Sequence, residues 1–298
     1  MIRAFNRTLR LFTLLNMYAI LTPHDHESQM IYISSSLCLA DQVGRLANVS
    51  AVPWLMFVIL RALNVRSGEY IINKNSSMIV TILNIVQGKQ FLHKIYIPEG
   101  YSVKQILTIL EGTDVLSGKI SVQPAEGTLI AGTYMCVRGT NRNTIIQMMQ
   151  RQANIVQKSY INGKLTRAEL VTIASLLEKE GLDYEDKSKI AAVILNRLKK
   201  GMRLQIDATL LYVKSGGEYN TYIKWNEVIS RSFENKVNYD NPYNTYRYKG
   251  LPPGPITNPG EESLKAASNP AIGRWLYYRV VNGKHKFSET FDEHRRKI

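Results

Sequence analysis

The feature that most constrains the fold is a short pattern that occurs three times before residue 115. Each copy opens with a β-branched or aromatic run, passes through a polar turn and continues with the apolar spacing of a helix. The copies begin at Gln29, Gly68 and Phe91, and the last two end at Gly88 and Gly112, where a helix is expected to stop. Repeated strand-then-helix units predict a small α+β region in which helices cover a short sheet.

The second half of the chain is predicted to contain several helices and one hairpin. Thr166 and Glu169 have the spacing of a capping box, and apolar side chains then recur at helical intervals up to Gly181. A further helix is predicted to end at Gly201. Near the end of the chain, Asn282–Gly283 separates two strand-like runs and therefore predicts a tight hairpin turn.

Residues 241–260 form a loop that contains five prolines, each of which restricts the backbone. Tyr243, Asn244, Tyr246 and Tyr248 lie within the same stretch. Tyrosine and asparagine side chains stack on sugar faces and hydrogen-bond sugar hydroxyls, so the composition is typical of a cleft that holds carbohydrate. A rigid loop with a purely structural role is the alternative.

The chain carries a strong excess of positive charge, with 38 Lys and Arg against 24 Asp and Glu. Such an excess suits a polyanionic partner: nucleic acid, an anionic membrane face or an acidic cell-wall polymer. The sequence has no RNA-binding aromatic signature, no zinc-finger spacing and no phosphate-binding glycine loop. We therefore do not expect nucleic acid to be the partner.

The N-terminus has the charge pattern of a membrane anchor. Arg3, Arg7 and Arg10 precede residues 11–22, which are uncharged and mostly apolar. This apolar run of 12 residues is shorter than the about 20 that usually span a bilayer. We interpret residues 1–27 as a cytoplasmic segment and a short anchor with the rest of the chain outside. An amphipathic first helix is the alternative.

The cysteines and histidines do not form a metal-binding pattern. Cys38 and Cys136 lie far apart in the sequence, and the five histidines are scattered. We expect two buried free thiols, although an exported protein could join the two cysteines in a disulfide. Neither a metal nor any other cofactor is predicted.

The stretch "ASLLEKEGLD", residues 174–183, places two glutamates near the end of a predicted helix. Glu178 and Glu180 are separated by roughly 200° around the helix axis, and they flank its apolar face on opposite sides. The helical wheel therefore does not decide which carboxylate is catalytic. Glu180 directly precedes Gly181, and a carboxylate at a helix C-terminus is disfavoured in its ionised form, which favours Glu180 as a proton donor. Solvated surface glutamates are the alternative.

Further polar residues follow this helix in positions that could reach a cleft. Asp207 lies in "LQIDATLLY" beside Gln205, and it is a candidate second carboxylate. Asn196 and Arg197 are polar residues on an otherwise apolar helix. For these two residues, a structural hydrogen-bond network explains the pattern equally well.

The motifs of the second half resemble those of the YceG-like endolytic murein transglycosylases. "ASLLEKEG" is similar to the catalytic helix of that family, and "VILNRLKKGMRLQIDATLLY" is similar to its Asn-Arg-Leu and Leu-Gln-x-Asp-x-Thr segment. "YNTYRYKGLPPGPITNPGEESLKAASNP" resembles its longest signature, and "YYRVVNGKHKFSETFDEH" its closing hairpin. The resemblance covers about 130 residues in the family's order.

This resemblance implies an α+β enzyme, a lyase that acts without metal or other cofactor. Such enzymes cleave the β-1,4 bond between N-acetylmuramic acid and N-acetylglucosamine within peptidoglycan and leave 1,6-anhydro ends. The family's catalytic glutamate corresponds to Glu180, with Glu178 as second choice. The positions that line the family's substrate cleft correspond to Gln205, Asp207, Asn244 and Tyr246.

The resemblance also implies a domain order and a location. After the anchor, residues 28–115 are expected to form a LysM-like domain, residues 116–165 a linker with a connecting helix, and residues 166–298 the catalytic domain with its Pro-rich cleft loop. The expected location is the cytoplasmic (inner) membrane, with one span and the catalytic domain on the periplasmic side. The expected partners are peptidoglycan strands, the membrane and peptidoglycan synthases, beside which the enzyme would terminate new strands.

Three other functions remain open from the sequence. A hydrolase of the same fold would use Asp207 to activate a water molecule as the second carboxylate. A non-catalytic module would bind the cell wall through its LysM-like half. Nucleic-acid binding by the basic surface is a weaker third alternative.

Overall fold

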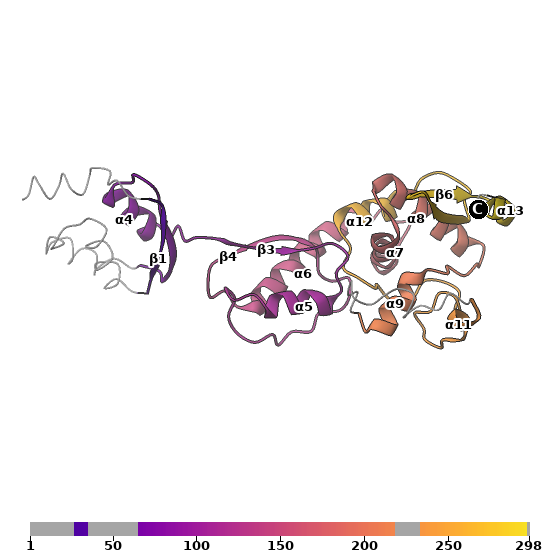
Figure 1. The fold of residues 1–298 in the computed structure, drawn as a ribbon, viewed down its shortest axis with the longest axis horizontal. Helices are drawn as coiled ribbons and strands as arrows, with labels where there is room; N and C mark the ends of the chain where they lie inside the picture. Colours follow the sequence, from indigo (N-terminus) through magenta and orange to yellow (C-terminus); the bar gives the residue numbers. More distant parts are fainter. Residues whose placement is uncertain (1–26, 35–64, 218–232, 297–298) are drawn as a thin grey trace, which may run out of the picture. The chain divides into compact units, whose positions relative to one another are not determined.

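The computed structural model describes residues 27–34, 65–217 and 233–296 (Figure 1). The predicted anchor and Cys38 lie outside these residues. By packing, the chain forms two compact units: Met1–Lys94 with Met135–Gly139, and Ile95–Tyr134 with Thr140–Ile298. The mixture of helices and strands agrees with the predicted α+β class. The domain limits expected at residues 27, 115 and 165 remain predictions, and so does a LysM-like domain.

The described residues of the smaller unit include two strands and a helix of the repeated pattern, and the helix expected after the first strand lies outside these residues. β1 (Gln29–Ile33) pairs antiparallel with β2 (Gly68–Ile72), and α4 (Met78–Val86) follows. Arg138 forms an ion pair with Glu69 of β2, which ties the later stretch of this unit to the earlier one. The buried side chains of these elements include Ile33, Tyr70, Ile72 and Ile85.

The third copy of the pattern is also confirmed. β3 (His93–Ile97) pairs with β4 (Gly132–Cys136), and α5 (Val103–Glu111) ends at Gly112 as predicted. α6 (Arg142–Ser159) is connected to α5 by its first residue, since Arg142 donates hydrogen bonds to the carbonyl oxygens of Leu110 and Glu111. This side chain satisfies carbonyl groups that the end of a helix leaves without partners. Cys136 at the end of β4 is a buried free thiol.

Three helices form the core around the predicted catalytic glutamates. α7 (Arg167–Glu180) packs against α8 (Tyr184–Lys199), and α12 (Glu261–Ser268) packs against both (Figure 1). The side chains buried between them include Leu170, Ile173, Leu177, Ile190, Ile194 and Leu264. The capping box of Thr166 and Glu169 is confirmed, so α7 begins where the sequence predicts.

Glycines that end helices usually adopt a left-handed backbone conformation, but Gly181 at the end of α7 does not. Its φ of −91° and ψ of 147° are extended values that any residue can adopt. A Cβ at this position would lie 2.3 Å from Cγ of Lys187 and 3.1 Å from its Cα. Gly181 is therefore required because the first turns of α8 pass directly over it.

The last part of the chain surrounds one end of α7 and α8. In the chain, α9 (Asp207–Ser215) and α11 (Phe233–Asn238) precede the Pro-rich loop of residues 241–260. The hairpin of β5 (Tyr277–Val281) and β6 (Lys284–Ser288) follows this loop. The hairpin turns at Asn282–Gly283, whose φ values are 52° and 72°. Two consecutive left-handed residues make the type I′ turn that the Asn-Gly pair predicts. α13 (Phe291–Arg296) then packs on the hairpin.

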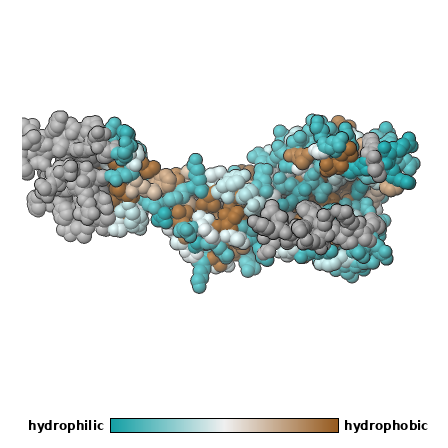
Figure 2. Space-filling model, viewed as in Figure 1, coloured by the Kyte–Doolittle hydropathy of each residue, from teal (hydrophilic) through white to brown (hydrophobic). Residues whose placement is uncertain are grey.

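On the face drawn in Figure 2, hydrophilic residues cover most of the region of α7 to α13, and hydrophobic residues occur there in small separate groups. The apolar side chains of these helices are instead packed into their shared core. Among the residues that the structure describes, no helix combines the length and the hydrophobicity needed to cross a membrane.

Candidate active site

Glu180, in the last turn of α7, lies at a cavity of about 650 Å³. The Tyr278 hydroxyl of β5 donates a hydrogen bond of 2.8 Å to Oε2 of Glu180. Burial raises the pKa of the Glu180 carboxyl, and the nearby Asp207 charge acts in the same direction; these effects outweigh the opposing effects of the Tyr278 hydrogen bond, His285 and the backbone N–H of Ala208 in α9. The surroundings of Glu180 thus favour the protonated form of its carboxyl, which lines the cavity.

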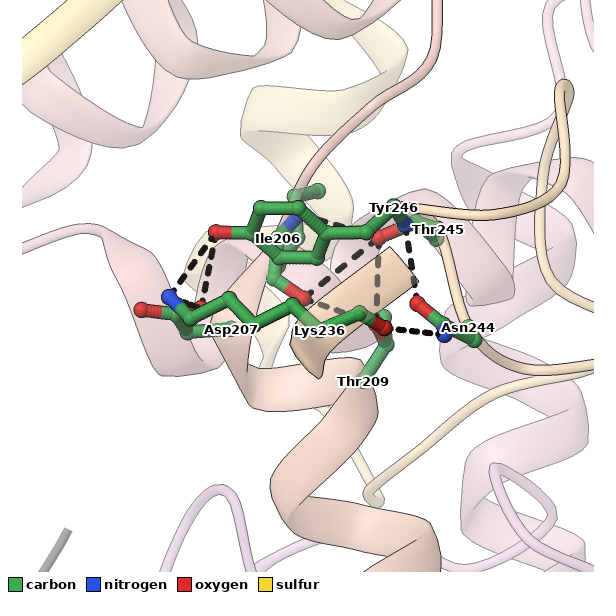
Figure 3. A network of polar contacts seen from close by, with 7 residues as sticks. All are labelled: Ile206, Asp207, Thr209, Lys236, Asn244, Thr245 and Tyr246. Atoms are coloured by element: carbon green, nitrogen blue, oxygen red, sulfur yellow. Dashed lines mark hydrogen bonds and ion pairs between the residues drawn. The ribbon is translucent and has the colours of Figure 1, made fainter. Parts of the chain in front are cut away.

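Asp207, at the first position of α9, is held by two groups from the following segment. Nζ of Lys236 lies 2.6 Å from Oδ1 of Asp207, and the Tyr246 hydroxyl donates a hydrogen bond of 2.8 Å to the same oxygen (Figure 3). Burial and the Asp207 charge raise the pKa of Tyr246, so its hydroxyl remains a donor. Asp207 and Tyr246 line the cavity, and the ammonium group of Lys236 holds them from behind the cavity wall.

Gln205 lines the same cavity and has a strained backbone. Its φ of 53° lies in the left-handed region, which is unfavourable for a residue with a Cβ. The Pro-rich loop maintains this conformation: the Gln205 N–H donates to the Thr245 carbonyl at 3.1 Å, and the Ile206 N–H donates to the Thr245 hydroxyl at 2.9 Å. Figure 3 shows Thr245 between Ile206 and Asn244 in this network.

Asn244 is not among the residues that line the cavity. Its side chain is fully buried, and it donates hydrogen bonds to the carbonyl oxygens of Lys236 and Tyr239 at 2.8 and 2.6 Å. Its own side-chain oxygen accepts from the N–H of Tyr246 at 3.0 Å (Figure 3). The amide of Asn244 therefore connects α11 to the loop and places Tyr246, and it has no group left facing the cavity.

Glu178 faces away from the cavity, toward α12. Its carboxylate accepts hydrogen bonds from the Gly260 N–H at 2.9 Å and the Ser263 hydroxyl at 2.6 Å, both at the N-terminus of that helix. Lys187 of α8 pairs with the same carboxylate at 3.3 Å, and both side chains are less than a tenth exposed. Glu178 therefore stabilises the packing of α7, α8 and α12.

Asn196 and Arg197, the polar residues near the end of α8, make hydrogen bonds that mainly stabilise the fold. Asn196 donates hydrogen bonds to the carbonyl oxygens of Gly273 and Trp275. Arg197 donates to the carbonyl oxygens of Leu204 and Leu276, and its guanidinium also lines the cavity. Both side chains hold the segments that carry the cavity walls.

The Pro-rich loop contributes to the site in two ways. Its first half supplies Tyr246 to the cavity, as described above. Its second half packs on α7, where the Ile256 N–H donates to the Ser175 hydroxyl at 3.1 Å and the Thr257 hydroxyl donates to the Ser175 carbonyl. The loop thus both contributes to the cavity wall and packs on the core, while its contact with carbohydrate remains a prediction.

The groups that were not predicted from the sequence include Tyr278 and His285, which line the cavity, and Lys236, which contacts Asp207. His285 of β6 shares a contact of 2.6 Å between its Nδ1 and Oδ2 of Asp186, and both side chains are largely buried. Tyr278 and His285 come from facing strands of the hairpin. Strand alternation around the Asn-Gly turn could have indicated that they share a face. No comparable signal marks Lys236. Within the described residues, no group of three or more His, Cys, Asp or Glu side chains could hold a metal ion.

Comparison with known proteins agrees with the motifs. The model of the YceG-like family matches residues 36–298. The chain belongs to the YceG-like family. This confirms the resemblance inferred from its second half. Within this family, the chain is similar to the endolytic murein transglycosylase of Bacillus subtilis, with 30% identity over 269 residues that cover 78% of this chain and 71% of the Bacillus protein.

Other YceG-like proteins show the same relationship. The endolytic murein transglycosylase of Streptococcus pneumoniae R6 is 32% identical over 179 residues, which cover 58% of this chain and 31% of the pneumococcal protein. A crystal structure of a protein described as yceG-like from Listeria monocytogenes matches with a TM-score of 0.57 and 27% identity. That match covers 91% of this chain and 98% of the Listeria chain.

Proposed function

We propose that this protein is a murein lytic transglycosylase, a lyase that cleaves the β-1,4 bond between N-acetylmuramic acid and N-acetylglucosamine inside glycan strands. The observation that carries the proposal is Glu180, a carboxyl with a raised pKa at a cavity of about 650 Å³. Relatives named endolytic murein transglycosylases, at 30% and 32% identity, support the reaction class.

In the first step, Glu180 acts as a general acid. Its proton passes to the O4 oxygen of the departing N-acetylglucosamine as the glycosidic C1–O4 bond breaks. A raised pKa keeps the carboxyl protonated in a range where an ordinary glutamate is ionised. The Tyr278 hydroxyl at 2.8 Å fixes the orientation of the carboxyl and stabilises the carboxylate that results.

In the second step, the same residue acts as a base. The Glu180 carboxylate takes the proton from the C6 hydroxyl of the muramyl sugar as O6 bonds to C1. The product is a 1,6-anhydro end, and Glu180 is again protonated for the next cycle. No water molecule is consumed, and each proton that leaves Glu180 returns to it.

The other cavity groups position the sugar. Gln205 and Tyr246 line the cavity and carry groups that can hydrogen-bond hydroxyls or acetamides. Asp207 already accepts from Lys236 and Tyr246 at one of its oxygens. This pairing favours a role in orienting neighbours over the activation of water, and it is the reason that we place lytic cleavage above hydrolysis.

Product analysis tests this proposal. Purified glycan strands are digested with wild type, Glu180→Gln and Glu178→Gln, and the fragments are weighed by mass spectrometry. We expect 1,6-anhydro ends, lighter than reducing ends by one water, from wild type and Glu178→Gln but not from Glu180→Gln. Reducing ends alone would show hydrolysis instead. Strand binding without cleavage by any variant would identify a non-catalytic binding module.

We also propose that the protein acts at the cytoplasmic membrane, with one N-terminal span and the catalytic region outside, beside peptidoglycan synthases. Arg3, Arg7 and Arg10 before the apolar run of residues 11–22 support this orientation. Endolytic cleavage there would terminate new strands. Membrane fractionation of the full chain with and without residues 1–22 tests the location: recovery of both forms in the soluble fraction would contradict it.

A further inference from the structure

Arg279 of β5 is a cation at the active-site cavity that the proposed reaction does not use. Its Nε atom is buried and has no hydrogen-bond partner. Across residues 27–34, 65–217 and 233–296, its side chain also has no ion pair. A buried guanidinium nitrogen without an acceptor is costly, because it has lost water and gained nothing in exchange.

The neighbouring cations differ from Arg279 in this respect. Arg197 donates to the carbonyl oxygens of Leu204 and Leu276 at 2.7 and 2.6 Å and lies over the ring of Tyr277 at 5.3 Å. Lys236 pairs with Asp207 at 2.6 Å. Arg279 is thus the guanidinium at this cavity that retains its capacity to bind an anion from outside the described chain.

The chemistry of the proposed substrate indicates which anion this is. The two sugars of murein carry hydroxyls and acetamides, and the lactyl group of muramic acid is joined to a peptide as an amide. The carboxylates of a murein strand therefore belong to its peptide stems. A guanidinium matches a carboxylate with two parallel hydrogen bonds, which makes arginine well suited to this recognition.

We propose that Arg279 forms a subsite for a stem-peptide carboxylate, so that the enzyme prefers glycan strands that carry peptide stems to strands that have been stripped of them. This inference rests on the proposed murein cleavage. The rings of Tyr277 and Phe291 also line the cavity, with centroids 5.8 Å apart, and Phe291 is 56% exposed. They offer an apolar surface beside the guanidinium for the stem.

The experiment compares three soluble substrates: strands with stems, strands whose stem carboxyl groups have been amidated, and strands from which an amidase has removed the stems. Release of anhydro ends by the full chain is measured for wild type, Arg279→Gln, Arg279→Lys and Lys286→Gln. Lys286 is the matched control, because it pairs with Arg279 across the hairpin but is exposed and does not line the cavity.

We expect wild type and Lys286→Gln to cleave stem-bearing strands about tenfold more efficiently than amidated or stripped ones, as one charge-assisted hydrogen bond predicts. Arg279→Gln should cleave all three substrates at the rate of the stripped strands, and Arg279→Lys should keep part of the preference. Equal cleavage of the three substrates by wild type would overturn the subsite and leave the proposed reaction intact. An equal fall on all three substrates in Arg279→Gln would also overturn it.

If wild type releases no anhydro product from any of the three substrates, that result contradicts the proposed reaction itself. A loss of the preference in Lys286→Gln as strong as in Arg279→Gln would show a general charge effect and would contradict a subsite at Arg279.

Discussion

The two sides of the last turn of α7 carry the same residue type in opposite surroundings. On one side, the carboxylate of Glu178 is paired with Lys187 and accepts hydrogen bonds from the Ser263 hydroxyl and the Gly260 N–H. On the other side, Glu180 faces a cavity, and burial raises its carboxyl pKa. A carboxylate with three partners serves stability, whereas one with few partners and little water can exchange a proton.

The comparison predicts its largest effect for Glu180→Gln. Glutamine is close in size and still accepts the Tyr278 hydrogen bond, but it cannot donate or take the proton. We expect the rate of strand cleavage to fall by roughly 10²- to 10⁴-fold with the fold intact. Cleavage assays with circular dichroism of the same samples check this result, and retention of more than a tenth of the wild-type rate would contradict the role of Glu180.

Glu178→Ala should act on stability. It leaves the ammonium of Lys187 with only the more exposed Glu262, at 3.1 Å, and removes the partner of two donors at the start of α12. We expect a loss of about 3 kcal/mol in the free energy of unfolding, measured by urea denaturation. The double variant Glu178→Met with Lys187→Met should recover part of this loss; an unchanged stability in Glu178→Ala would break the contrast between the two glutamates.

The next prediction concerns Gly181→Ala, a change at the residue that directly follows Glu180 at the end of α7. The backbone of Gly181 is extended, so alanine fits its dihedral angles, but the new Cβ would lie 2.3 Å from Cγ of Lys187. We expect a destabilisation of about 1–3 kcal/mol from this overpacking. Gly201→Ala is an informative comparison, because nothing lies within 4 Å of its Cβ and any cost there comes from its φ of 63°.

The smallest predicted effect is a pH-dependent difference in stability between wild type and Glu180→Gln. The folded-state pKa of Glu180 lies above its ordinary value of 4.5, so stability falls as the pH rises from 4.5 to the folded pKa, because in that range the unfolded chain is ionised at this residue and the folded protein is not. The variant should therefore have the higher Tm above that pKa, and the difference should vanish below pH 4.5. Thermal melts across this range measure it; a constant difference would show that protonation of Glu180 is not its cause.

Much of the local structure was predictable because it depends on neighbours in the sequence. The capping box at Thr166 and Glu169, the helix stop at Gly112 and the turn at Asn282–Gly283 all appear as predicted. Each depends on backbone hydrogen bonds or dihedral angles within a few residues. The family could also be predicted, since its motifs are continuous stretches of the chain.

The candidate site was predictable only in part, because its residues come from segments far apart in the sequence. Gln205, Asp207 and Tyr246 meet Glu180 at one cavity, while Asn244 is turned inward to hold the loop. Tyr278 and His285 reach the cavity through the hairpin, about 100 residues after Glu180. Strand alternation indicates that Tyr278 and His285 share a face of the hairpin, but nothing in the spacing of the residues indicates that this face meets Glu180.

The sequence by itself determined that a helix ends at Gly181 with a glutamate on each flank of its apolar face. The tertiary structure decided which flank faces a cavity. α12 and Lys187 close over Glu178, whereas the hairpin leaves a cavity in front of Glu180. The physical reason is that a helical wheel defines directions around one axis, and the environment in each direction is set by elements that pack there from elsewhere in the chain.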